Sequence, residues 1–109
     1  MNKISKGNYY VKKTKEFLEK EGWVVEKSEI NFKIWTPKGI FFKKKDLFGA
    51  DLICINGKDI VFVQVKTNKV DVNKGLAEFK KYPFPAFVKK WVVIWPVRAR
   101  EPQVKELEL

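Results

Sequence analysis

A chain of 109 residues, 45% hydrophobic and 15% aromatic, has enough apolar side chains for one domain with its own core. Its 23 lysines and arginines against 13 aspartates and glutamates give a formal charge of +10. This excess favours a polyanionic partner, with nucleic acid ahead of an anionic membrane. The alternative is a lysine-rich surface that is merely solvated. Histidine is absent and Cys54 is the one cysteine, which excludes an internal disulfide, a structural zinc site and Ser-His-Asp catalysis.

The N-terminal part of the chain predicts a helix over residues 5–21. Tyr10, Thr14, Phe17 and Leu18 fall on one face at helical spacing, with lysines and glutamates around the rest. Gly22 stands where a helix commonly ends, because glycine adopts the left-handed conformation that closes the last turn.

The segment after this helix is β-type in composition. Residues 23–25 begin it, and the stretch up to residue 45 predicts one or two strands, including residues 32–35. A Pro-Lys-Gly sequence at residues 37–39 breaks the stretch, as expected of a turn.

The middle of the chain predicts a β-hairpin. Two apolar runs, residues 50–55 and 60–65, are joined around Asn56 and Gly57, and Asn-Gly is a strong signal for a tight turn. Cys54 lies inside the first run, so we expect a buried and inert thiol.

The remaining elements complete an α/β pattern. A second helix is predicted over residues 71–82, ended by Pro83. Residues 91–95 are nearly all apolar, as expected for a strand covered on both faces, and residues 103–109 alternate as an edge strand does. We therefore predict a single domain over residues 1–109, with a central mixed β-sheet flanked by helices.

No apolar stretch approaches the length of a membrane span, and the N-terminus lacks the apolar region of a signal peptide. The expected location is the cytoplasm. Without histidine, catalysis would depend on carboxylates, amides, lysine or tyrosine, together with a divalent ion that prefers oxygen ligands.

The predicted hairpin carries a set of polar side chains at one end. Asp51 begins its first strand, and Gln64 and Lys66 end its second. Pairing around the Asn-Gly turn brings these ends together, and Gln64 and Lys66 share a face because side chains alternate along a strand. One end of the sheet would then present a carboxylate, an amide and an ammonium group.

Phosphodiester cleavage needs such a set. A carboxylate holds Mg²⁺, the ion polarises the phosphate and acidifies a water, and a lysine orients or deprotonates that water. The backbone carbonyl of Val65 could supply a further oxygen ligand. The alternative is an ordinary basic hairpin with an aspartate and a lysine at its rim.

The stretch Gly-x-Asp-Leu at 49–52, Asn-Gly-Lys at 56–58 and Gln-x-Lys at 64–66 resembles archaeal and phage Holliday junction resolvases of the PD-(D/E)XK nuclease superfamily. Lys6-Gly7 at the helix start and Gly22-Trp23 after it add to this resemblance, which covers roughly residues 5–70. It implies a restriction-endonuclease-like, three-layer core and Mg²⁺ or Mn²⁺-dependent cleavage of branched DNA. By position, Asp51 matches the metal-binding aspartate, Lys66 the motif lysine, and Gln64 the usual glutamate.

Two departures lower the negative charge of the implied site. Gln64 is neutral, and the first-helix glutamate of these resolvases aligns with Tyr10. Asp46 could supply a missing metal ligand, although a turn or capping role explains it at least as well. Glu16 is the other candidate, although a solvated surface is the better explanation for it.

Lysines are expected to hold the DNA backbone, because lysine contacts phosphates rather than reading bases. The run that leads into the hairpin is the best candidate, and the full set is Lys6, Lys43, Lys44, Lys45 and Lys69. The resemblance also implies a homodimer, for which the apolar stretch 84–88 is a candidate surface beside packing within the monomer.

The sequence thus favours a metal-dependent endodeoxyribonuclease for branched or distorted DNA, acting in recombination, repair or phage replication. A second hypothesis is a non-catalytic DNA-binding module on the same fold. A third is an interaction or inhibitor protein whose surface is merely basic.

Overall fold

The computed structural model describes residues 3–67 and 71–107. In chain order the elements are α1 (Lys3–Lys20), β1 (Val24–Lys27), β2 (Glu29–Thr36), β3 (Gly39–Asp46), the short 3-10 helix η1 (Leu47–Gly49), β4 (Leu52–Ile55), β5 (Ile60–Lys66), α2 (Asp71–Lys80), β6 (Val88–Ile94) and β7 (Gln103–Glu106).

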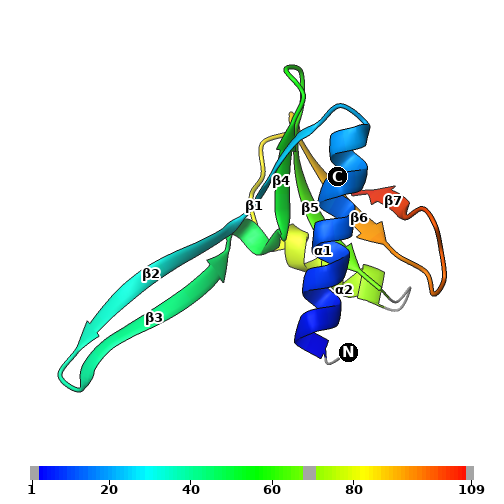
Figure 1. Cartoon of the computed structure of the whole chain (residues 1–109). Helices are drawn as coiled ribbons and strands as arrows, with labels where there is room; N and C mark the ends of the chain where they lie inside the picture. The colour runs from blue at the N-terminus through cyan, green and yellow to red at the C-terminus, as the bar shows by residue number, and fades with distance from the viewer. Residues whose placement is uncertain (1–2, 68–70, 108–109) are drawn as a thin grey trace.

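Five strands form the main sheet, in the order β1-β4-β5-β6-β7 (Figure 1). The central pair β5 and β6 is parallel and the other pairs are antiparallel, so the sheet is mixed. Helix α2 connects the parallel pair, because parallel neighbours need a crossover that a tight turn cannot provide. This confirms the predicted mixed sheet, with β7 at one edge.

The two helices cover opposite faces of the sheet and make three layers. Alternation along β5 decides which side chains face which helix: Val61 and Val63 pack into the cluster that contains Leu18 of α1. Phe62, between them, packs into the cluster that contains Phe79 of α2. Strand β5 is therefore apolar on both faces until its last residues, as expected of a central strand.

The predicted hairpin is confirmed as β4 and β5. Its turn is held by the side chain of Asn56, whose Oδ1 accepts hydrogen bonds from the backbone N–H of Lys58 (3.0 Å) and of Asp59 (2.8 Å). Gly57 has φ +90°, a conformation that glycine adopts without a steric cost. Cys54 is fully buried in this hairpin, and burial raises the pKa of its thiol to about 12, in keeping with an inert cysteine.

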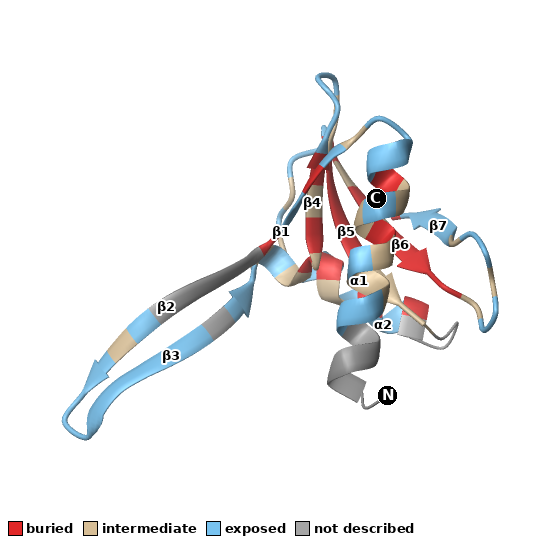
Figure 2. Ribbon diagram, viewed as in Figure 1, coloured by how far each residue is buried: buried red, intermediate tan, exposed pale blue. Residues whose placement is uncertain are grey.

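The segment between α1 and β4 divides between two sheets. Only β1 joins the main sheet, while β2 and β3 pair with each other as a separate two-stranded ribbon. This ribbon projects from the body of the protein, and its described residues are mainly exposed (Figures 1 and 2). The sequence predicts one or two strands over residues 23–45, whereas the structure has three, and two of them leave the main sheet.

Two hydrogen bonds hold the base of the ribbon against the main sheet. Buried Ser28 donates through its hydroxyl to the carbonyl of Ala50, and its backbone N–H donates to the carbonyl of Asp51 at 3.2 Å. The root of the ribbon is therefore tied to the start of β4, where the candidate catalytic residues lie.

Among the described residues, no helix is long and apolar enough to cross a membrane.

Candidate active site

Asp51 is clamped to the end of β5. It directly precedes β4, and its backbone N–H donates to the carbonyl of Val63 at 2.8 Å. Its side-chain Oδ2 accepts a hydrogen bond from the backbone N–H of Val65, also at 2.8 Å. Because N–H and C=O of one strand residue point to the same edge, the Val65 carbonyl lies on the side of Asp51. The carboxylate is therefore oriented before any ligand arrives.

The predicted catalytic side chains line one open cavity of about 410 Å³. Asp51 comes from the start of β4, and Gln64 and Lys66 come from the end of β5. The complete lining is Lys45, Asp46, Gly49, Asp51, Gln64, Lys66, Lys74, Glu78 and Tyr82. The cavity thus combines the end of the ribbon, the end of the hairpin and one face of α2.

A smaller hollow of about 210 Å³ adjoins the first on the side of α1. Asp46 and Asp51 line both hollows, and Asn8 of α1 lines the smaller one together with Val11 and Lys27. The two aspartates therefore stand where the two hollows meet, close enough for the charge of Asp46 to act on Asp51.

The pKa of Asp51 is raised above its ordinary value of 3.8, chiefly because burial takes the charged carboxylate out of water. The hydrogen bond from Val65 opposes this shift, the negative charge of Asp46 adds to it, and the positive charge of Lys66 opposes it. A carboxylate in this position gains from a bound cation, which replaces the lost hydration.

Gln64 is held at the back of the cavity and is only 3% exposed. Its Nε2 donates to the carbonyl of Gly49 at 2.8 Å, which orients the amide. Its Oε1 is buried and, within the described part of the chain, has no hydrogen-bond partner. Helix α2 approaches so closely here that a Cβ on Gly75 would lie 2.6 Å from Oε1. An unpaired buried acceptor costs free energy, and a cation or a water would satisfy it.

The donor set fits Mg²⁺ or Mn²⁺. The carboxylates of Asp51 and Asp46, the Oε1 of Gln64 and the Val65 carbonyl are all hard oxygen donors. In the described residues no three acidic, histidine or cysteine side chains gather into a ready-made metal site. Mg²⁺ does not need such a cage, since it is usually held by one or two carboxylates and keeps several waters.

The first helix contributes a different residue than the resemblance implied. Tyr10 turns toward the core, where its ring centroid lies 6.1 Å from that of Trp95. Thr14, one turn later, accepts a 2.7 Å hydrogen bond from the indole N–H of Trp95, so this helix face is used for packing. Glu16 is exposed and lines neither hollow, whereas Asn8 does.

The predicted phosphate-binding lysines are only partly brought to the site. Lys45 lines the larger cavity, and Lys43 is exposed on the ribbon. Lys44 lies between them on β3, and Lys6 lies in the first turns of α1. Lys69 falls outside the described residues.

Helix α2 and the turn after it supply site residues that sequence reasoning missed, namely Lys74, Glu78 and Tyr82. Glu78 adds a carboxylate to the cavity, and its Oε2 pairs with Lys81 at 3.1 Å. One signal could have found them: Gly75 marks a close helix-to-sheet approach, and Lys74 and Glu78 flank it at helical spacing. Periodicity alone does not give the rotation of α2 against the sheet.

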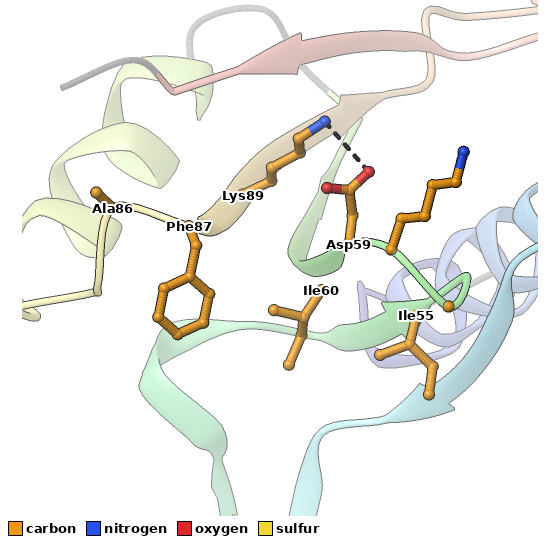
Figure 3. A pocket seen from close by; sticks show the side chains of 8 residues that line it. Ile55, Asp59, Ile60, Ala86, Phe87 and Lys89 are labelled. Atoms are coloured by element: carbon orange, nitrogen blue, oxygen red, sulfur yellow. Dashed lines mark hydrogen bonds and ion pairs between the residues drawn. The ribbon is translucent and has the colours of Figure 1, made fainter.

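Another hollow, of about 610 Å³, lies at the opposite end of the hairpin (Figure 3). Ile55, Ile60 and Phe87 give it apolar walls, and its ion pair joins Lys89 to Asp59 at 3.5 Å. With a single, already paired carboxylate among its lining residues, it lacks the ligands of a metal-dependent active site.

The architecture matches a solved structure, that of Hjc, a Holliday junction resolvase from the archaeal hyperthermophile Archaeoglobus fulgidus. The match has a TM-score of 0.53 and 16% sequence identity, and it covers 93% of this chain and 75% of Hjc. The chain has the Hjc fold. No model of a known protein family matches the chain, and no curated protein sequence matches it significantly. The likeness to Hjc therefore lies in the three-dimensional arrangement, and it confirms the predicted restriction-endonuclease-like core.

Proposed function

We propose that this chain is a divalent-metal-dependent endodeoxyribonuclease that cuts branched or distorted DNA in recombination, repair or phage replication. The observation that carries the proposal is the convergence of Asp51, Gln64 and Lys66 in one cavity at the end of the β4–β5 hairpin. The Hjc fold supports it, because Hjc is a Holliday junction resolvase. The formal charge of +10 supports DNA as the partner.

Each residue has a separate role in this proposal. Asp51 and Asp46 would hold Mg²⁺ or Mn²⁺, with Gln64 Oε1 and the Val65 carbonyl as neutral ligands. When bound, the ion polarises the scissile phosphate and acidifies a coordinated water. Lys66 would orient the attacking water and offset the charge that develops on the phosphate. Cutting two strands of a junction symmetrically requires two such sites, so we propose a homodimer.

The test is cleavage of a labelled four-way junction and of a matched linear duplex, with Mg²⁺, with Mn²⁺ and with chelator. We expect cutting of the junction that requires the metal and that exceeds cutting of the duplex. Salt-sensitive binding without cutting under any metal condition would contradict the endonuclease and leave a DNA-binding module. Absence of binding would contradict both.

Replacing Gln64 with glutamate should move metal affinity and stability in opposite directions. An added negative ligand is expected to tighten Mg²⁺ binding roughly tenfold, since affinity for hard cations follows ligand charge. Without metal, the variant loses the hydrogen bond to the Gly49 carbonyl and buries a second acid beside Asp51, which costs about 1–3 kcal/mol.

Thermal unfolding across a Mg²⁺ titration measures both effects in the Gln64→Glu variant. Gln64→Met is the matched control: it has a similar volume but no oxygen, so its Mg²⁺ midpoint should rise above that of the wild type. Identical midpoints in all three proteins would remove Gln64 from the set of metal ligands.

A further inference from the structure

The β2–β3 ribbon exposes large apolar side chains that the rest of the described chain does not cover. Trp35 is 76% and Phe42 72% exposed, and Ile40 and Phe41 are also exposed. A two-stranded ribbon standing alone is marginally stable in water, because it has no third strand or helix to pack on. Its exposed rings therefore indicate a surface that contacts a partner.

Each face of this ribbon carries both aromatic rings and lysine ammonium groups. The register pairs Trp35 with Ile40 and Lys33 with Phe42, and cross-strand partners point to the same side. Lys33 Nζ lies 5.9 Å from the centroid of the Phe42 ring. The register also pairs Ile34 with Phe41, which places Phe41 on the other face, where Lys43 follows two residues later.

The charge of the ribbon selects an acidic partner. Residues 30–45 contain five lysines and no acidic residue, while Glu29 and Asp46 pair at its base. An apolar or basic protein surface would leave these lysines without counter-charges. Nucleic acid fits better, since it offers phosphates to the lysines and flat base surfaces to the rings.

The ribbon begins at the candidate active site. Asp46, the last residue of β3, lines both hollows with Asp51, and Lys45 beside it lines the larger one. Each strand has eight residues, and at the usual rise of a strand they span about 26 Å. That length corresponds to about seven or eight base pairs of DNA.

We propose that the β2–β3 ribbon is a DNA-binding arm that runs along the DNA away from the cleaved phosphate and confers the preference for branched DNA. Its lysines contact the backbone, and Trp35 and Phe42 stack on bases that are unpaired or unstacked near the branch point. A two-stranded ribbon also has a width that the major groove admits. The placement relative to the cleaved phosphate rests on the proposed function; the binding role of the arm does not.

The test compares the affinity of the wild type and of variants for a labelled four-way junction and for a matched duplex, in chelator so that no cleavage occurs. Trp35→Ala with Phe42→Ala should weaken junction binding about tenfold or more, because the stacking of bases on aromatic rings is lost. Duplex binding should change less than threefold. Val97→Ala is the control, since Val97 is 82% exposed and lies between β6 and β7, outside the ribbon. Its affinity for both DNAs should stay unchanged.

A second variant, Lys33→Ala with Lys38→Ala and Lys43→Ala, tests the backbone contacts. It should weaken junction and duplex equally and lower the slope of log affinity against log salt by about 2 to 3. Wild-type affinity and salt slope in both variants, with unchanged circular dichroism, would overturn the proposal.

Two further results distinguish a DNA-binding arm from a subunit contact and from the endonuclease activity. If the aromatic variant sediments as a smaller species than the wild type but binds junctions normally, the arm is a subunit contact and the proposal is wrong. Weakened junction binding in a protein that never cuts DNA would overturn the endonuclease and uphold the arm.

Discussion

Asparagine at position 51 is expected to abolish metal-dependent cleavage while leaving the fold intact. The amide oxygen can still accept the hydrogen bond from the Val65 N–H, so the geometry of the hairpin end is preserved. The lost charge removes the main ligand of the ion, whose contribution is several kcal/mol and therefore about 10³-fold in rate or more. Single-turnover cleavage of a junction by Asp51→Asn measures this loss.

The same variant has a second expected signature that does not depend on activity. Burial raises the pKa of the Asp51 carboxyl above 3.8, so the folded state binds its proton more tightly than the unfolded chain does. This group therefore adds stability at pH below 3.8, and that stability is lost as pH rises through the folded-state pKa. At neutral pH the metal-free wild type carries a buried negative charge that Asp51→Asn lacks.

Thermal unfolding should accordingly show Asp51→Asn to be at least as stable as the wild type at neutral pH without metal. The advantage should shrink as pH falls toward the ordinary pKa of the carboxyl. Mg²⁺ should raise the melting temperature of the wild type and leave that of the variant unchanged. A variant that still cuts, or that responds to Mg²⁺ like the wild type, would remove Asp51 from the metal site.

Loss of the Lys66 ammonium group is expected to slow cleavage by about 10²-fold or more, the usual contribution of a group that acts on the attacking water. Lys66 lines the cavity beside Asp51, and its charge acts on that carboxylate. Junction affinity in chelator should fall only a few-fold, because one lysine among 23 basic residues is a small part of the electrostatic attraction.

Single-turnover rates and junction affinities of Lys66→Ala separate these two effects. Lys58→Ala is the matched control: Lys58 is exposed on the turn at the far end of the same hairpin, so both rate and affinity should be those of the wild type. A rate for Lys66→Ala within threefold of the wild type would remove Lys66 from the catalytic set.

Local sequence signals are sufficient for the core of the candidate site. The apolar runs 50–55 and 60–65 flank the turn at residues 56–59, so that Ile55 pairs with Ile60 and Leu52 with Val63. This register brings Asp51, just before β4, beside the end of β5. Alternation then directs Gln64 and Lys66 to the same side of β5. These relationships depend on residues close in sequence, so they require no knowledge of the remaining fold.

The residues that complete the site come from elements far away in the chain, and their positions could not be predicted. Glu16 is a candidate metal ligand by its place on the first helix, yet the structure leaves it exposed and brings Asn8 to the site. The reason is the rotation of α1, which packing of Leu18 and Thr14 against the sheet decides. Glu78 was missed for the same reason on α2.

The amino-acid sequence by itself determined the two helices, the hairpin that carries Asp51 and Lys66, and the basic character of the surface. Turn chemistry, periodicity and composition are local properties, which do not depend on contacts between distant segments. Only the tertiary structure decided which helix faces border the cavity and that β2 and β3 leave the main sheet as a separate arm. Strand propensity does not determine which strand a segment pairs with. Contacts between distant segments decide that β1 pairs with β4 and that β2 pairs with β3.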